Sequence, residues 1–292
     1  MIDAFKPEYL KYASYLSSLT KKYQGGTLEM PPGHWGGVET IFKGKSDIVA
    51  LFYRKKNSSL RWVKYFSWLN AFGNFGRIII DSVINIIRFL KGRELFRTGN
   101  IPLNKLHNFE IAIEKPLYKI DGVEFYYFGK LDYLGHRYGT KSEQIIKAVK
   151  RIDKKISKID FDILFSDHGM VDITKTISVP ISDKCFIDSD MARYWGEKEQ
   201  LEKIKEKLPL SYGKIINWRD KKYGNLIFMA ETGILIWPNF WKENNPDKAM
   251  HGYDGKHKEM KAFYIIKKDG KKTNIKAGQL HKILIQMLKD GR

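Results

Sequence analysis

Adjacent carboxylate and imidazole groups, Asp167 and His168, end one apolar segment of the sequence. The segment, Phe161 to Phe165, is rich in residues that favour a buried strand, and Gly169 permits a sharp exit after the pair. Oxygen and nitrogen ligands of this kind suit zinc or manganese. An aspartate in such a turn also serves commonly as the cap of the next helix, and the pair alone does not separate the two interpretations.

Two further places carry the same side chains. Asp132 and His136 are four residues apart, so one helical turn would bring both to the same face. His251 stands beside Gly252, in a loop ahead of another apolar segment. Each place taken singly is also compatible with an ordinary solvated turn. Together they offer a carboxylate and two imidazoles at strand-flanking positions.

The start of the chain adds another acid, Asp3. Met1 to Phe5 looks like the end of a strand, and Pro7 opens the helix that follows. Only two residues precede Asp3, whereas a central strand has about five or six. We therefore expect that native residues precede Met1 or that the start of the chain is misassigned.

Alternating strand and helix patterns would position these side chains. We expect strands at Asp47 to Tyr53, Val123 to Phe128, Phe161 to Phe165, Leu226 to Ala230, Ile234 to Pro238 and Ala262 to Ile266. We expect helices at Lys141 to Ile159, with a capping box of Thr140 and Glu143, at Glu197 to Leu208 and at Ala277 to Lys289. This alternation predicts an α/β fold with a mostly parallel sheet, which binds ligands beyond the carboxyl ends of its strands.

The segment from Leu60 to Phe96 breaks this alternation. It is aromatic and basic, and its apolar part, Ile78 to Leu90, carries only a narrow polar stripe. One interpretation is an inserted cap whose apolar face packs on the core. The other is a lid or a helix that lies on a membrane surface.

Composition limits the possible classes of protein. The chain has 292 residues, and the 43% of them that are hydrophobic exclude a wholly disordered protein. Its formal net charge of +19 favours anionic partners. The charge alone raises the hypothesis of nucleic-acid binding, but no recognition motif accompanies it. The single cysteine, Cys185, excludes a disulfide framework. With no signal peptide at Met1 and no apolar run of about 18 residues, we expect a cytoplasmic protein.

Taken in order, these motifs resemble the type I phosphodiesterase/nucleotide pyrophosphatase family of the alkaline phosphatase superfamily. The resemblance implies a three-layer α/β/α alkaline-phosphatase-like fold with an inserted helical cap. It also implies two divalent metals, usually zinc, with manganese as the alternative. One metal would be held by Asp3, Asp167 and His168, and the other by Asp132, His136 and His251. Two such metals about 4 Å apart can hold the attacking and leaving oxygens of a phosphoryl transfer.

The sequence departs from the family at the nucleophile. The family's threonine or serine would fall between His34 and Gly36, and His34, Trp35 and Gly36 carry no hydroxyl. Gly36 and Gly37 can still bind phosphate through backbone N–H groups at the start of a helix. Catalysis would then use a water activated by a metal, or it would be lost and a binding site would remain.

We therefore predict a single domain, 1–292, with a cap insertion at about 55–118. The predicted function is metal-dependent hydrolysis or transfer at a phosphodiester or pyrophosphate bond, with a non-catalytic phosphate-ester-binding protein as the alternative. The aromatic, basic insertion favours a nucleotide or lipid-linked substrate, and it favours a protein that is cytoplasmic and peripheral to a membrane.

Overall fold

The computed structural model describes residues 1–34, 36–44, 52–93, 103–111, 122–218, 220–241, 245–270 and 273–290. The chain divides into two compact units. The first unit comprises Met1–Val49, Tyr118–Lys175 and Asp247–Arg292, and the second comprises Ala50–Leu117 and Thr176–Pro246. All six residues predicted as metal ligands belong to the first unit.

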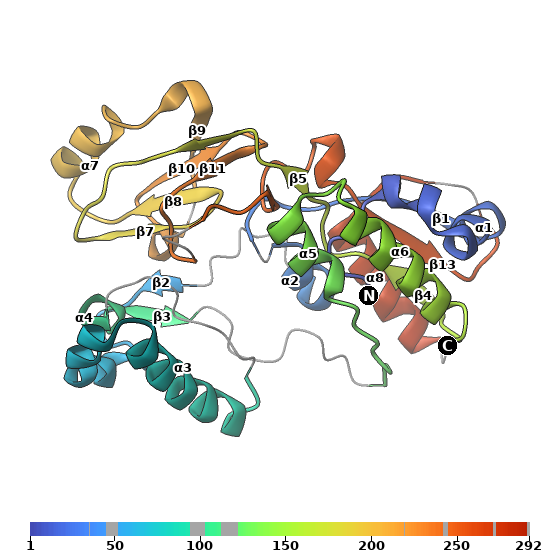
Figure 1. Cartoon of the computed structure of the whole chain (residues 1–292), viewed down its shortest axis with the longest axis horizontal. Helices are drawn as coiled ribbons and strands as arrows, with labels where there is room; N and C mark the ends of the chain where they lie inside the picture. The colour runs from blue at the N-terminus through green and yellow to red at the C-terminus, as the bar shows by residue number, and fades with distance from the viewer. Residues whose placement is uncertain are drawn as a thin grey trace. The chain divides into compact units, whose positions relative to one another are not determined.

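The first unit is built around a four-stranded sheet in the order β14-β1-β13-β4 (Figure 1). Its strands are β1 (Gln24–Glu29), β4 (Ile163–Phe165), β13 (Ala262–Ile266) and β14 (Ile275–Lys276), beside a separate pair, β5 (Val171–Asp172) and β12 (Ala249–Met250). Its α-helices are α1 (Ser14–Lys22), α2 (Gly36–Lys43), α5 (Lys130–Tyr138), α6 (Glu143–Ile156) and α8 (Ala277–Lys289), and its 3₁₀-helices are η1 (Pro7–Tyr12) and η5 (Lys258–Met260).

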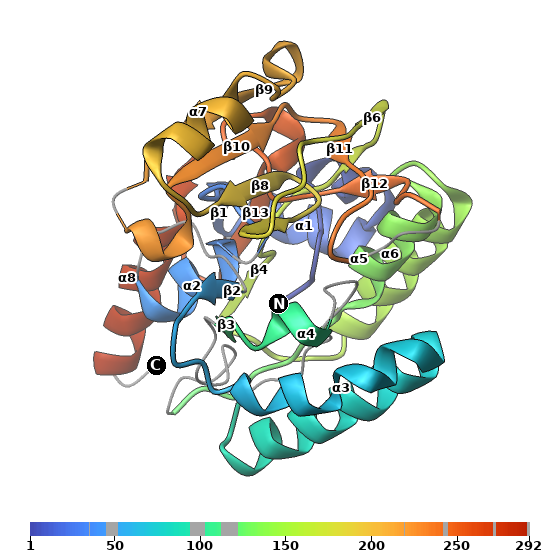
Figure 2. The same ribbon diagram turned by 90° about the vertical axis from the view of Figure 1, so that its left-hand side faces the viewer.

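Helices cover both faces of this sheet. Along β13, Phe263 and Ile265 pack into one core with α1 and α6, whereas Tyr264 and Ile266 pack into a second core with α2 and α8. This alternation is the two-residue period of a strand that is buried on both sides. Figure 2 shows the same arrangement, with α2 and α8 on one side of the strands and α5 and α6 on the other.

The first strand, β1, was not predicted, because its glycines have a low preference for strands. A Cβ at Gly25 would lie 2.7 Å from the carbonyl oxygen of Tyr264, and one at Gly26 would lie 1.9 Å from that of Thr273. Glycine is therefore required by the close approach of neighbouring backbone, which local propensity does not reveal.

The N-terminal residues lie between two other segments of the first unit. The N–H of Ile2 donates to the carbonyl of Phe165 at 2.9 Å, and the N–H of Asp3 donates to that of Phe128 at 3.1 Å. Ile2 and Phe128 form a parallel bridge. Three chain segments therefore end side by side, directly before the residues that carry the predicted ligands.

The second unit contains the antiparallel sheet β7-β8-β10-β9 and two smaller strand pairs. Its strands are β2 (Phe52–Arg54), β3 (Phe109–Ile111), β6 (Lys175–Ile177), β7 (Cys185–Ile187), β8 (Met191–Tyr194), β9 (Gly213–Ile216), β10 (Leu226–Ala230) and β11 (Ile234–Ile236). Its helices are η2 (Arg61–Phe72), α3 (Gly73–Leu90), α4 (Leu103–Leu106), α7 (Lys198–Lys205), η3 (Leu210–Tyr212) and η4 (Lys221–Tyr223).

The α/β class is confirmed, but the mostly parallel sheet and the complete three-layer arrangement are not. Strand β1 pairs antiparallel with β13 and β13 pairs antiparallel with β4, whereas β1 and β14 are parallel. The sheets are short and mixed, and the antiparallel partners β1, β13 and β4 come from distant parts of the chain.

Most of the predicted elements are present, with shifted ends. Strands β10 and β13 and helix α8 have the predicted bounds, whereas β4, β11, α6 and α7 are shorter than predicted. Val123 to Phe128 is wrong as a complete strand, since only the bridge at Phe128 forms. Of the strand predicted at Asp47 to Tyr53, Phe52 and Tyr53 lie in β2, and residues 47–51 are outside the described part of the chain.

The predicted cap of α6 is also wrong. The helix is capped by Ser142, whose side chain accepts a hydrogen bond from the N–H of Ile145 at 3.4 Å. Thr140 is two residues too early for this role.

The insertion predicted at about 55–118 contains η2, α3 and α4, and it belongs to the second unit together with Thr176–Pro246. Residues 94–102 and 112–118 of that range lie outside the described residues. The single-domain organisation stays a prediction.

Candidate metal centre

Helix α5 presents Asp132 and His136 on one face, as their spacing predicts. His136 Nε2 lies 3.2 Å from Asp132 Oδ1. The helix can sit this deep because Gly135 lies between them: a Cβ there would lie 2.1 Å from Met170 Sδ. The glycine is thus explained by close packing against the chain that follows β4.

Asp167 and His168 follow the end of β4 and face Asp3. His168 Nε2 lies 3.3 Å from Asp3 Oδ1 and 3.6 Å from Asp167 Oδ2. The N–H of Ala4 donates to Asp167 Oδ1 at 3.3 Å, which orients this carboxylate. The parallel contacts of Ile2 with its neighbours therefore bring the first predicted ligand set together.

His251 joins the two ligand sets. Its Nε2 lies 3.5 Å from Asp132 Oδ1, and its ring stacks on that of His168 with centroids 3.7 Å apart and an angle of 7° between the planes. Ligand atoms of Asp132, His168 and His251 lie within 4.8 Å of one another, as do those of Asp3, Asp167 and His168. The structure thus brings all six predicted residues into one cluster.

Backbone carbonyls fix the orientation of two imidazoles. His136 Nδ1 lies 2.9 Å from the carbonyl oxygen of Ala249, and His168 Nδ1 lies 2.9 Å from that of Gly169. Because a carbonyl oxygen only accepts, Nδ1 carries the proton in both rings. Each Nε2 then faces the carboxylates, where it offers a lone pair to a metal when the ring is neutral.

Two further side chains, Tyr127 and Asp247, lie around the cluster and were not predicted from the sequence. Tyr127 donates its hydroxyl hydrogen to Asp3 Oδ2, and Asp247 Oδ1 lies 4.0 Å from His136 Nδ1. Tyr127 comes from the segment predicted as a strand, and its position two residues before Gly129 carries no signal of this role. Asp247 lies 111 residues from His136 along the chain, so only the fold reveals the contact.

Burial and mutual repulsion act on the two acids of the first set. Burial raises the pKa of Asp3 well above its ordinary value, and the carboxylates of Asp167 and Asp132 raise it further, against the hydrogen bond from Tyr127. Burial also raises the pKa of Asp167, against the opposing effect of His168. Without a cation, therefore, the folded protein resists full ionisation of this pair.

The second set has the opposite balance. Burial alone would raise the pKa of Asp132, but the neighbouring His136 and His168 outweigh it and hold this pKa at about 2. Burial lowers the pKa of His251 well below its ordinary value, and the charges of His168 and His34 lower it further. Asp132 is therefore ionised and His251 neutral near pH 7, which are the forms that bind metals.

The predicted phosphate-binding glycines stand at the start of α2. A Cβ at Gly37 would lie 2.1 Å from the carbonyl oxygen of Asp167, so the positive end of α2 adjoins the cluster. The ring of His34 lies 4.4 Å from that of His251. Trp35 lies outside the described residues. The methyl group of Thr40, the first residue after Gly37 with a hydroxyl group, faces Gly278 of α8.

The donor set fits divalent cations. Asp3 Oδ1, Asp132 Oδ1 and His251 Nδ1 are buried and have no hydrogen-bond partner within the described chain. Buried polar atoms are normally satisfied, so carboxylate oxygens left this way beside correctly oriented imidazoles indicate a cation. Mixed oxygen and nitrogen donors of this kind suit zinc, with manganese as a second choice.

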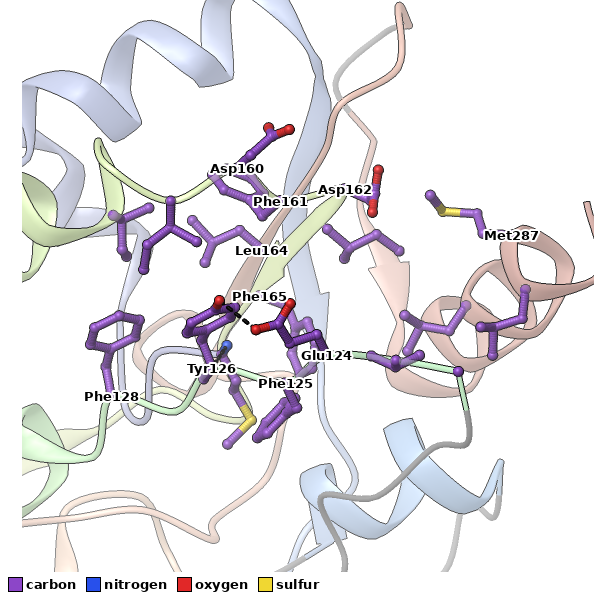
Figure 3. Close-up of a pocket in the computed structure, with 18 residues that line it drawn as sticks. Glu124, Phe125, Tyr126, Phe128, Asp160, Phe161, Asp162, Leu164, Phe165 and Met287 are labelled. Carbon is purple, nitrogen blue, oxygen red and sulfur yellow. Dashed lines mark hydrogen bonds between the residues drawn. The ribbon is translucent and has the colours of Figure 1, made fainter. Parts of the chain in front are cut away.

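A separate cavity of about 340 Å³ lies along β4 (Figure 3). The cluster follows the end of that strand. Its walls are mainly apolar and include Phe125, Phe161, Leu164 and Met287. None of the six predicted ligands lines it. The chemistry of the side chains, and not the size of this cavity, therefore identifies the candidate site.

Comparison with known proteins agrees with this geometry. A family model described as type I phosphodiesterase/nucleotide pyrophosphatase matches residues 98–207, which include Asp132, His136, Asp167 and His168. The chain is also similar to structures of ectonucleotide pyrophosphatase/phosphodiesterase 5 (ENPP5). An inactive threonine-to-alanine variant of the mouse protein in complex with AMP has 13% identity and a TM-score of 0.64. The mouse protein without that substitution has 14% identity and 0.64, and the human protein 13% and 0.62. In all three, the match covers 99% of this chain and 93% of the other.

The likeness to these solved structures shows the fold of the chain. The family model confirms the resemblance to the type I phosphodiesterase/nucleotide pyrophosphatase family that the motifs predict.

Proposed function

We propose that the protein is a two-metal hydrolase or transferase that acts on a phosphodiester or pyrophosphate bond. The observation that carries this proposal is the convergence of both predicted ligand sets, with His168 within reach of each. Two bound divalent cations, zinc or manganese, would supply positive charge that attracts a phosphate and stabilises the oxygens of an in-line displacement.

The chain's own residues perform the remaining tasks. Asp3, Asp167 and His168 would hold one cation, and Asp132, His136 and His251 the other. The backbone N–H groups of Gly36 and Gly37, at the positive end of α2, would bind the phosphate oxygens. Because no hydroxyl side chain occurs from His34 to Gly37, the attacking group would be water.

Metal analysis of the purified protein tests the site. We expect two metal ions per chain in the parent and fewer in Asp132→Ala and in Asp167→Ala. Asp172→Ala is the matched control, because this nearby carboxylate accepts a hydrogen bond from the N–H of Thr140 and belongs to neither ligand set. Unchanged metal content in both ligand variants would contradict the proposal.

A panel of diesters, monoesters and pyrophosphates then tests the reaction. The mouse ENPP5 variant with AMP makes nucleotides a first choice. The apolar and basic segment at 60–93 makes a lipid-linked phosphodiester the second. Turnover that disappears on chelation and returns with zinc or manganese is the expected result.

A non-catalytic phosphate-ester-binding protein is the second candidate. The stretch from His34 to Gly37, without a hydroxyl, favours it specifically. It predicts two bound metals and metal-dependent binding of AMP, with no turnover of any compound in the panel.

We further propose a cytoplasmic location. Separately, within the described residues no helix is both long and apolar enough to cross a membrane.

A further inference from the structure

Helix α3 of the second unit packs inward through a narrow stripe. Ile80 and Ile84 are buried, and Gly76 lies so close to η2 that a Cβ there would be 2.0 Å from the carbonyl oxygen of Leu69. These residues recur every four positions and so lie on one side of the helix. The stripe accounts for the attachment of α3 to its own unit.

The opposite side of α3 is apolar and exposed. Phe75, Ile78, Ile86, Phe89 and Leu90 are between 60% and 77% exposed. At 100° per residue these five positions span roughly a third of the helix circumference, on the side away from Ile80 and Ile84. The solvent-facing side of a surface helix normally carries charged and polar residues. An exposed apolar face of this kind therefore indicates a surface that binds a partner.

The 3₁₀-helix η2 adds aromatic side chains beside α3. Tyr65, Trp68 and Phe72 are between 57% and 70% exposed. Tyrosine and tryptophan favour the boundary between water and lipid, since each combines an apolar ring with a polar group.

Positive charge accompanies this apolar surface. Residues 61–93 contain six basic side chains, five of them at least partly exposed since Arg88 is buried, and one acid, Asp81. Arg61 and Lys91, near the two ends, are exposed. Such charge repels a second copy of the same surface and attracts anionic lipid headgroups.

We propose that the outward faces of α3 and η2 form a docking surface for an anionic lipid bilayer, with α3 lying parallel to the membrane. The argument for lipid over a second copy of the chain is the combination of aliphatic side chains with exposed arginine, lysine and aromatic residues. The proposal deepens the proposed function, because it would bring the metal centre to phosphodiesters at a membrane, but its observations come from α3 and η2 alone.

Vesicle cosedimentation tests the docking surface. The full-length protein is mixed with vesicles of phosphatidylcholine alone or with added phosphatidylglycerol. We expect binding to the anionic vesicles and weakening by salt. In the variant Ile78→Ser/Ile86→Ser/Leu90→Ser we expect roughly a hundredfold loss of affinity, since each partly inserted aliphatic side chain contributes about fivefold.

The control variant is Ile181→Ser/Leu210→Ser, which removes exposed apolar side chains of the same unit away from α3 and η2. It should bind vesicles like the parent. Equal binding by the α3 variant and the parent overturns the proposal, and so does a parent that ignores anionic vesicles. A parent that forms a dimer through α3 and does not bind vesicles identifies a second copy as the occupant and also overturns it.

A water-soluble diester separates this proposal from the metal centre. Both serine variants should hydrolyse it at the parental rate, whatever their vesicle binding. A parent that binds vesicles but contains no metal would support the docking surface and refute the proposed function.

Discussion

Replacement of Asp3 by asparagine should stabilise the metal-free protein and weaken the metal-loaded one. Ligand atoms of Asp3 and Asp167 lie within 4.8 Å of each other. At an effective dielectric constant of about 20, two charges at that distance repel by about 3 kcal/mol. Asparagine removes the charge but keeps an oxygen that can accept the hydrogen bond from Tyr127. We expect the chelated variant to gain about 1–3 kcal/mol at pH 7.5, or roughly 2–4 °C in Tm for each kcal/mol.

The effect has a defined pH dependence. The folded-state pKa of Asp3 is raised above its ordinary value of 3.8, so between these two values the folded protein binds more protons than the unfolded one. Its stabilising contribution is complete below pH 3.8 and is lost as the pH rises through the folded pKa. The advantage of Asp3→Asn in chelator should therefore grow from near pH 4 toward neutral pH.

Bound metal should make the parent more stable than Asp3→Asn, the reverse of their order in chelator. A cation whose free concentration is about a thousand times its Kd adds about 4 kcal/mol to the free energy of unfolding of the parent. It adds much less to a variant that lacks one ligand. The assay is thermal unfolding of both proteins at several pH values, in chelator and in zinc.

Asp153 supplies the control, since it is buried outside the cluster and accepts hydrogen bonds from the N–H groups of Tyr15 and Leu16. Asp153→Asn should lose about 1–2 kcal/mol with or without metal. A chelated Asp3→Asn protein less stable than the parent at pH 7.5 would refute the reasoning, because Asp3 would then act as a structural hydrogen-bond acceptor.

Three smaller changes test individual contacts. Tyr127→Phe removes the donor to Asp3 and should weaken zinc binding about 10- to 100-fold in a chelator competition, with little change in fold by circular dichroism. Gly37→Ala places a methyl group against the carbonyl of Asp167 and should lower the free energy of unfolding in urea by about 1–3 kcal/mol. In the control Gly278→Ala, the new methyl group meets nothing closer than 3.9 Å, so stability should stay the same or rise. Equal effects of the two substitutions would contradict the close approach of α2. Ser142→Ala should cost about 1 kcal/mol in the same measurement through loss of the α6 cap, and an unchanged midpoint would show that the cap contributes nothing.

The residues of the cluster could be selected from the sequence as candidate ligands because their chemistry is local. Asp132 and His136 lie one turn apart, and Asp167 and His168 directly follow a strand whose apolar character is plain. The side chains that tune them could not be predicted this way. Asp247 meets His136 across 111 residues of chain, and nothing in the local sequence of either indicates the other.

The strands could be predicted where the burial of side chains sets the sequence pattern. The prediction failed where close packing of backbone sets it. Strand β13 has the predicted bounds because both of its faces are buried and all five residues are apolar. Strand β1 was missed because Gly25 and Gly26 are required by neighbouring carbonyls and not by strand propensity. The parallel sheet was overestimated because alternation of strands and helices does not report the direction in which a strand returns.

The first unit is assembled from three separate stretches of chain, and this has a consequence during synthesis. Asp3 leaves the ribosome early, whereas His251 follows 248 residues later, after the whole second unit. At about 5–20 residues per second, roughly 12–50 s separate the two. During that interval Asp3 has no complete set of partners. A cation that binds once His251 is in place would therefore stabilise the protein at the end of folding and would not nucleate folding.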